Sequence, residues 1–254
     1  MTDPRALAYV NLYGILATLE NLCALDETAK TILSKLKSPV SLCFEVKDGP
    51  CGTLHFDQDS CIFTEGSEGC TCKMFFPSPK AFNDLIDKSK PGVPTRNPVQ
   101  VLSFLLGPFT ALTNRLTQLL RPSPEDLKDR AFFELSTTLT FYTIVGGISA
   151  LANHDSISQI SASNTCDGDI SLGIAGVASA TIRVRDNHFV TIKKAAENPR
   201  AKMEFADLDL AYSLFNGTAS TINELCKGNI RLAGMISMVD NVNRILDRIA
   251  VYLA

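Results

Sequence analysis

Apolar residues change their spacing along this chain, and the same change occurs twice. Between residues 7 and 22 they recur every three or four positions, which predicts a helix. Between 41 and 46 they alternate with polar residues, which predicts a strand. The same order of periods returns after residue 125. Each half therefore predicts a leading helix, three or four antiparallel strands, a helix, a closing strand and a final helix, which is an α+β order.

The pattern places the individual elements as follows. The first half predicts strands at 41–46, 53–56, 60–64 and 70–76, a helix at 79–86, a loop at 89–97 and a closing strand at 99–102. The second half predicts a helix at 125–152, a polar and mobile segment at 153–167, strands at 169–175, 178–185, 188–193 and 201–205, a helix at 208–215, a closing strand at 229–233 and a terminal amphipathic helix. Helix caps are expected at Asp26, Ser78 and Asp207.

Three blocks of the first half match blocks of the second at nearly one spacing. Residues 41–45 overlay 171–175, residues 53–56 overlay 181–184, and residues 73–76 overlay 202–205, with shifts of 130, 128 and 129 residues. The break between the copies is expected in the proline-containing stretch 121–126. The sequence therefore predicts two domains, 1–121 and 122–254.

The second copy carries two stretches with a recognisable character. Residues 224–235 read ELCKGNIRLAGM, a short strand held between two glycines that leads into a terminal helix, and residues 201–211 read AKMEFADLDLA, a strand that feeds an acid-capped helix. Both stretches resemble the sterol carrier protein 2 (SCP2-like) family. The resemblance implies an α+β fold of two tandem SCP2-like modules, each a mostly antiparallel sheet covered by helices on one face.

The same resemblance implies a function and a site. SCP2-like modules are non-catalytic carriers that hold an apolar ligand, fatty acyl or sterol-like, in a tunnel between sheet and helices. The chain is then not an enzyme and needs no cofactor. In the first copy Val99 and Leu105 stand where the second has Gly228 and Gly234, so its cavity is expected to be reshaped or filled. The candidate ligand-binding residues of the second copy are Phe205, Leu208, Phe215, Leu232, Met235, Met238, Val239 and Val242. The alternative for each is an ordinary core position, since helical spacing is typical of both.

The sequence is also compatible with two other functions. Tandem modules with closed cavities would serve as a pseudo-dimeric protein-interaction module. A metal or redox protein would instead use the cysteines gathered in the first half, Cys43, Cys51, Cys61, Cys70 and Cys72, with His55 nearby. Metal sites commonly use C-x2-C spacing, whereas here the near pair is C-x-C, so no metal site is assigned.

Composition and charge limit the classes of binding partner that are expected. The 254 residues carry a net charge of −3, which argues against nucleic-acid binding. The uncharged runs 97–114 and 135–153 contain prolines or many hydroxyl side chains, so they are interpreted as core helices and no integral membrane segment is expected. No leader is visible, so a cytoplasmic protein with reduced thiols is expected. An apolar small molecule or lipid is the expected partner, which allows transient membrane contact.

Overall fold

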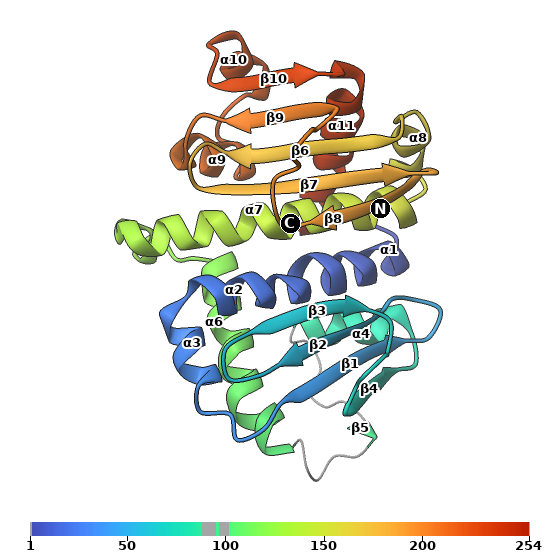
Figure 1. Cartoon of the computed structure of the whole chain (residues 1–254), viewed down its shortest axis with the longest axis vertical. Helices are drawn as coiled ribbons and strands as arrows, with labels where there is room; N and C mark the ends of the chain where they lie inside the picture. Colours follow the sequence, from blue (N-terminus) through green and yellow to red (C-terminus); the bar gives the residue numbers. More distant parts are fainter. Residues whose placement is uncertain (1, 88–94, 97–101, 254) are drawn as a thin grey trace. The chain divides into compact units, whose positions relative to one another are not determined.

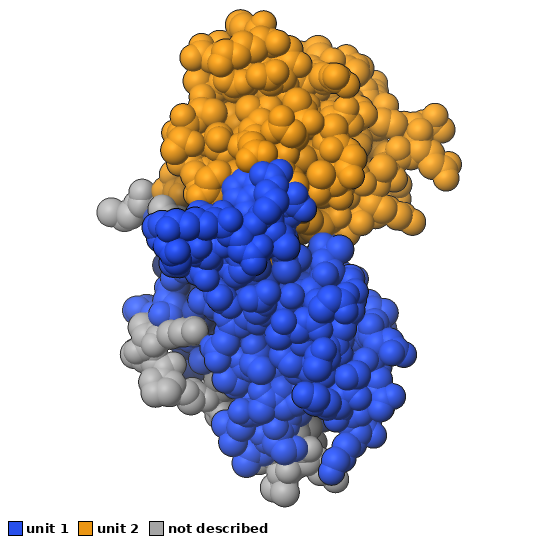
Figure 2. Space-filling model, turned by 90° about the vertical axis from the view of Figure 1, so that its left-hand side faces the viewer, with its two compact units in different colours: residues 1–135 blue, residues 136–254 orange. Residues whose placement is uncertain are grey.

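A computed structural model describes residues 2–87, 95–96 and 102–253. The chain forms two compact units, Met1–Leu135 and Ser136–Ala254, which are coloured separately in Figure 2. The order of elements starts again after α6 (Thr110–Leu120), near the expected break at residue 121. Helix α7 (Arg130–His154) begins in the first unit and continues into the second.

The first unit opens with one long helical segment whose hydrogen bonding changes along its length. This segment comprises α1 (Pro4–Tyr9), the π-helix η1 (Val10–Ile15), the 3₁₀ turn η2 (Leu16–Thr18) and α2 (Leu19–Leu25). The remaining elements are α3 (Glu27–Leu33), β1 (Val40–Val46), β2 (Cys51–Phe56), β3 (Cys61–Glu65), β4 (Cys72–Phe76), α4 (Pro79–Ile86), β5 (Thr95–Arg96), the π-helix η3 (Leu105–Phe109), α6 and the 3₁₀ turn η4 (Asp126–Lys128).

The second unit repeats this order around a second sheet. After α7 come α8 (Ser158–Ser163), β6 (Gly168–Ile174), β7 (Ala178–Arg185), β8 (His188–Ile192), β9 (Ala201–Phe205), α9 (Leu208–Phe215), α10 (Thr221–Cys226), β10 (Ile230–Gly234) and α11 (Ile236–Leu253).

Each unit contains one five-stranded sheet, and the two sheets have the same topology (Figure 1). The strand order is β3-β2-β1-β4-β5 in the first and, read the same way, β8-β7-β6-β9-β10 in the second. In both, the central strands β1 and β4, or β6 and β9, are parallel, and all other neighbours are antiparallel. Buried residues alternate along β4 and β9, so helices cover one face of each sheet. The predicted α+β fold is confirmed.

Strand register corrects one part of the internal alignment. Leu42 lies opposite Leu54 in the first sheet, and Ile170 lies opposite Ile182 in the second, so β1 and β2 both map onto the second unit with a shift of 128. The overlay of 41–45 on 171–175 was therefore wrong by two residues. A slip of two leaves every side chain on its own face of the sheet, which is why the alternating pattern could not detect it.

A buried threonine fixes the crossover in each unit. Because β4 lies parallel to β1, the chain must cross the sheet between β3 and β4, on the face away from the helices. Thr53 donates its hydroxyl to the carbonyl of Gly66 at 2.7 Å, and Thr181 donates to the carbonyl of Lys194 at 2.8 Å. Both threonines are buried. The two bonds are related by the shift of 128, so the repeat extends to individual hydrogen bonds.

A buried aspartate ties the second helix of each unit to its last helix. Asp26 accepts from Arg115 through both carboxylate oxygens, at 3.0 and 3.2 Å, instead of making the expected side-chain cap. Asp155 accepts from the hydroxyl of Tyr252 at 2.8 Å and lies 3.5 Å from Arg248. Burial raises the pKa of Asp155, but hydrogen bonds from Ser158, Tyr252 and Arg248 outweigh it, and the pKa lies below its usual value.

Two expected helix caps are confirmed by the structure. The side chain of Ser78 accepts from the amide of Ala81 at 3.2 Å, and Asp207 accepts from Leu210 at 2.8 Å. Each cap satisfies an amide that has no partner inside the first turn of its helix. The sequence therefore located the starts of α4 and α9 correctly.

Other predictions were wrong. The segment 153–167 is not irregular, because it contains α8, and α10 was not predicted. The closing strand expected at 99–102 lies mostly outside the described residues. Leu102 itself is helical, and Thr95–Arg96, expected in a loop, pair with β4 instead.

Helix α7 has the length and hydropathy of a membrane span, and it is the one such helix among the residues that the structure describes. Within its most apolar 18-residue window, 83% of the residues are buried inside the protein. Burial on all sides is the pattern of a core helix, as the sequence predicted for residues 135–153.

We expect Asp155→Asn to destabilise the packing of α8 on α11. The substitution leaves the half-buried Arg248 beside a neutral amide; breaking a fully buried ion pair costs about 3–5 kcal/mol, and the partial exposure of Arg248 puts the cost here at the lower end of that range. Hydrogen exchange of the α8 and α11 amides at pH 7 measures this as a smaller opening free energy. The pKa of Asp155 is lowered in the folded protein, so its carboxylate stabilises the fold at pH values above the ordinary pKa of aspartate, about 4, and this stabilisation is lost as the pH falls further. The wild-type protein should therefore lose this part of its stability on acidification, and Asp155→Asn should show no such loss. Asp247→Asn, at an exposed position of α11, is the control, and equal exchange in both variants would contradict the prediction.

Candidate functional site

The candidate site is the apolar layer between the second sheet and the helices α9 and α11. Phe205 of β9 lies opposite Ile230 of β10, and Met203 lies opposite Leu232, so these four side chains project from the same face of the sheet. Helix α11 packs against both strands, and α9 packs against β9 (Figure 1). Seven of the eight predicted ligand-binding residues lie on these elements, and Met235 lies between β10 and α11.

The eight candidates divide by exposure. Five are buried, namely Phe205, Leu208, Met238, Val239 and Val242. Three are half-buried, namely Phe215, Leu232 and Met235. The rings of Phe205 and Phe215 meet edge to face with centroids 5.9 Å apart, which joins β9 to α9. The layer is therefore closed over β9 and partly open toward the edge strand β10.

Backbone geometry fixes the position of Met235. Gly234 has a φ of +76°, and a Cβ at this position would overlap the carbonyl oxygen of Arg200. Glycine is therefore required here. The next amide, that of Met235, donates to the same carbonyl at 2.9 Å. These contacts turn the chain from β10 into α11 and hold Met235 at the mouth of the apolar layer.

The corresponding layer of the first unit is filled by phenylalanine rings. Phe82 contacts Phe76 and Phe44 with centroid distances of 5.0 and 6.3 Å, and Phe56 contacts Phe104 at 5.1 Å. Aromatic rings packed edge to face fill such a layer densely.

The second unit has smaller side chains at three of these positions. Strand register makes Leu172 the counterpart of Phe44 and Val184 the counterpart of Phe56. Counting from the helix caps makes Ala211 the counterpart of Phe82. The ring of Phe56 is not lost from the layer, because its cross-strand partner Cys61 corresponds to the buried Phe189, so the reduction in side-chain size is at the positions of Phe44 and Phe82.

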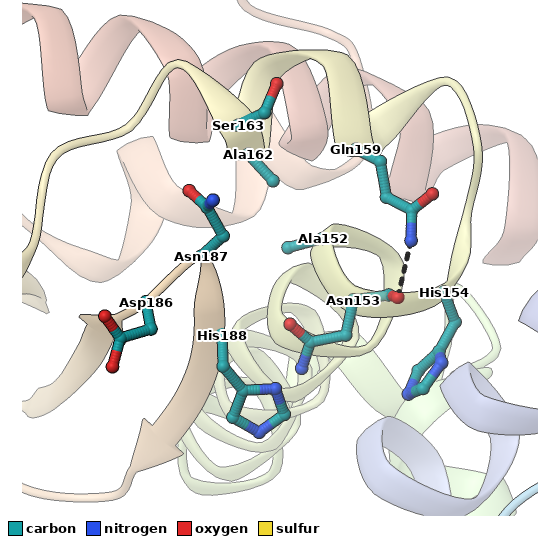
Figure 3. Close-up of a pocket in the computed structure, with 9 residues that line it drawn as sticks. All are labelled: Ala152, Asn153, His154, Gln159, Ala162, Ser163, Asp186, Asn187 and His188. Carbon is teal, nitrogen blue, oxygen red and sulfur yellow. Dashed lines mark hydrogen bonds between the residues drawn. The ribbon is translucent and has the colours of Figure 1, made fainter.

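A polar hollow of about 390 Å³ lies elsewhere in the second unit (Figure 3). It is bordered by the end of α7, by α8 and by the β7–β8 turn, and its lining residues are Ala152, Asn153, His154, Gln159, Ala162, Ser163, Asp186, Asn187 and His188. None of the eight predicted site residues lines it. The sequence did not predict this hollow, because α8, which forms one side of it, lies in the segment 153–167 that was expected to be irregular.

Several of the polar side chains that line the hollow make hydrogen bonds within the protein. Asn153 donates its amide to the carbonyl of Phe189 at 2.8 Å and accepts from the Phe189 amide at 2.9 Å, which ties β8 to α7. Gln159 donates to the carbonyl of Asn153 at 2.8 Å, and Ser163 donates to the carbonyl of Ile160 at 3.0 Å. Within the described ranges 2–87, 95–96 and 102–253, no group of three or more His, Cys, Asp or Glu side chains is placed to hold a metal ion.

The five cysteines of the first unit's sheet region divide between its two faces. Cys43 and Cys51 lie on the face away from the helices with their Sγ atoms 3.9 Å apart, and Cys70 is near enough to interact electrostatically with Cys43. Cys61 and Cys72 are buried, opposite the core residues Phe56 and Leu42. None of the eight cysteines, all of which lie within the described residues, forms a disulfide bond.

The positions of Cys43 and Cys51 in the sheet disfavour a disulfide bond between them. Cys43 lies opposite Thr53 and Cys51 opposite Glu45, so the two cysteines are diagonal neighbours. Diagonal Cα atoms lie roughly 7–8 Å apart, beyond the range of an unstrained disulfide. Burial raises the pKa of the Cys43 thiol to about 12, so Cys43 is almost entirely protonated at neutral pH.

Comparisons with known proteins return structures of one family. No family model matches the chain, and no curated protein matches it significantly. Similar solved structures include a UbiJ-SCP2 ubiquinone synthesis protein, with 15% identity over 42% of this chain and 95% of that chain and a TM-score of 0.32. Sterol carrier protein domain 2 of Helicoverpa armigera has 11% identity over 45% of this chain and 89% of its own, with a TM-score of 0.35. Sterol carrier protein 2 like 2 from Aedes aegypti has 15% identity over 39% and 90%, with a TM-score of 0.29. All three names belong to the family that the sequence resembles.

We expect Cys43 to resist alkylation in the folded protein. A thiol with a pKa of about 12 is ionised to only about one part in ten thousand at pH 8, and Cys43 is also buried. Exposed Cys166 and Cys226 should react with iodoacetamide within minutes, whereas Cys43 should remain unmodified until urea is added. Peptide mass spectrometry measures each site separately, and equal labelling of Cys43 and Cys166 in the folded protein would refute this.

Proposed function

We propose that the chain is a non-catalytic carrier of apolar ligands, fatty acyl or sterol-like, and that the second unit holds the ligand between its sheet and helices. The observation that carries this proposal is the difference between the two units. Where the first has Phe44 and Phe82, the second has Leu172 and Ala211, at equivalent positions of the same fold. A layer with smaller side chains has room to accept a ligand when the helices move apart.

The half-buried residues supply the mouth of such a site. Phe215, Leu232 and Met235 are partly accessible and continue into the buried core through Phe205 and Met238. Burying apolar surface is worth about 25 cal/mol per Å², so a chain that buries a few hundred Å² gains several kcal/mol before ordering costs. Methionine side chains adapt to ligands of irregular shape, which suits a carrier of several related molecules.

The chemistry around the site supports binding without catalysis. The eight candidate residues are all apolar, so they offer neither a nucleophile nor an acid–base pair. The proposal therefore assigns no catalytic residue and no cofactor. Eight cysteines that form no disulfide bond favour a reducing compartment, so we propose that the carrier acts in the cytoplasm.

Native mass spectrometry of freshly purified protein, followed by organic extraction, tests the proposal. A bound apolar species is expected in the extract, and refolded protein should take up added fatty acid. A protein that carries no ligand and takes up neither fatty acid nor sterol would overturn the carrier function. It would favour the interaction module with closed layers instead.

We expect Met235→Glu to reduce uptake of a fluorescent fatty acid by about tenfold or more, because a carboxylate at the mouth must lose water when the ligand passes or binds. Leu106→Glu is the matched control. Leu106 is an exposed apolar residue at the same place in the first unit's sequence, a shift of 129. Binding titrations should show a loss for Met235→Glu and wild-type affinity for Leu106→Glu. The reverse order would place the ligand in the first unit.

A further inference from the structure

Three large apolar side chains flank the edge strand of the second sheet. Ile222 and Leu225 of α10 are 73% and 41% exposed, and Ile236, the first residue of α11, is 50% exposed. Helix α10 contacts β10, and β10 pairs with β9 on its other side (Figure 1). Leu232 lies on β10, which α10 contacts, and Ile236 directly follows Met235, so the edge of the sheet carries a strip of exposed apolar side chains along β10 and at its end.

Helix α10 is held loosely enough to adjust to a surface. It contains no buried residue. Gly217 and Gly228 stand on either side of it, both with positive φ, and a Cβ at either position would meet nothing. Its main ties are local, including the cap from Ser220 and the pair formed by Lys227 and Glu224. Few buried contacts mark a segment with a low cost of local opening.

The face of the sheet beside this strip has an excess of exposed positive charge. Arg183 and Arg185, whose side chains are 46% and 54% exposed, share Asp169, which is 15% exposed. A second group adjoins the edge strand, where Lys202 pairs with Glu204 and Arg231 lies opposite Glu204. Along the strands of this face the two groups have four cations for two acids, and the group next to β10 contributes one net positive charge, since β7 lies three strands away from β10.

We propose that this edge, made of α10, β10 and the neighbouring cations, docks on an anionic phospholipid bilayer. Exposed isoleucine and leucine side chains bordered by arginine and lysine match the acyl boundary and the phosphates of such a surface. A second copy of the chain would bring the same positive face and be repelled. An acidic protein partner would satisfy the charges but would leave Ile222 without an apolar environment. The inference rests on the proposed carrier function, because a carrier must meet the membrane that holds its cargo.

The test is co-sedimentation of the full chain with vesicles. Vesicles of phosphatidylcholine with one third phosphatidylserine should bind the wild-type protein, and vesicles of phosphatidylcholine alone should bind it several-fold more weakly. Ile222→Ser with Leu225→Ser should lower the partition coefficient roughly tenfold or more, because two exposed apolar side chains no longer insert. Lys202→Gln with Arg231→Gln should remove most of the preference for the anionic vesicles and flatten the dependence on salt.

Matched controls keep the result specific. Ile157→Ser with Ile160→Ser removes two exposed isoleucines at and beside α8 in the same unit, and Arg244→Gln removes an exposed cation of α11. Both variants should bind as the wild type does. Wild-type binding by the Ile222 and Leu225 variant, or no binding of the wild-type chain to either vesicle, overturns the proposal. So does a concentration-dependent dimer, seen by light scattering, that the same variant abolishes, because it assigns the edge to a second copy.

Uptake of fatty acid from an ethanol dispersion, with no vesicles present, separates this inference from the proposed function. If docking is the role of the edge, the Ile222 and Leu225 variant keeps wild-type uptake and loses only the rate of transfer from vesicles. If the carrier function itself is wrong, the wild-type chain takes up no fatty acid, whatever its binding to vesicles.

Discussion

The parallel pairing of β6 with β9, and of β1 with β4, is the constraint on which the rest of each unit depends. A parallel neighbour cannot be reached through a hairpin, so the chain must cross the sheet before β9 begins. The crossing occupies the face opposite the helices and is held by Thr181 in one unit and Thr53 in the other. Because the loop takes that face, the helices gather on the other, and each unit has one apolar layer instead of two.

The same constraint places the closing strand of the second unit at an edge. β10 pairs on the far side of β9 from β6, where it has one neighbour. The apolar layer therefore ends at a strand whose other side is not paired in the sheet, next to Leu232 and Met235. An opening at this edge leaves the paired centre of the sheet undisturbed, so α10 can shift with little cost to the fold. The mouth of the candidate site and the proposed docking strip are both consequences of this position.

The sequence predicted the elements whose signals are local. The caps at Ser78 and Asp207 and the limits of β7, β9, α4 and α9 depend on neighbouring residues alone, and the structure confirms them. The short helices α8 and α10 were missed because six residues give too little periodicity to stand out from a polar segment. The role of Asp26 could not be predicted, since its partner Arg115 is 89 residues away and captures the carboxylate that would otherwise cap α3.

The sequence predicted the residues of the candidate site from their spacing, and the tunnel between sheet and helices only through the family resemblance. Helical spacing identified Met238, Val239 and Val242 as facing the sheet, and a core residue has the same spacing as a ligand-binding one. A ligand-binding residue differs from a core residue in the free volume beside it, and that volume depends on every side chain between the sheet and the helices. The internal repeat supplies a comparison that a single module could not. Phe44 and Phe82 fill the layer of the first unit with aromatic rings, and Leu172 and Ala211 are smaller residues at the same positions of the second unit.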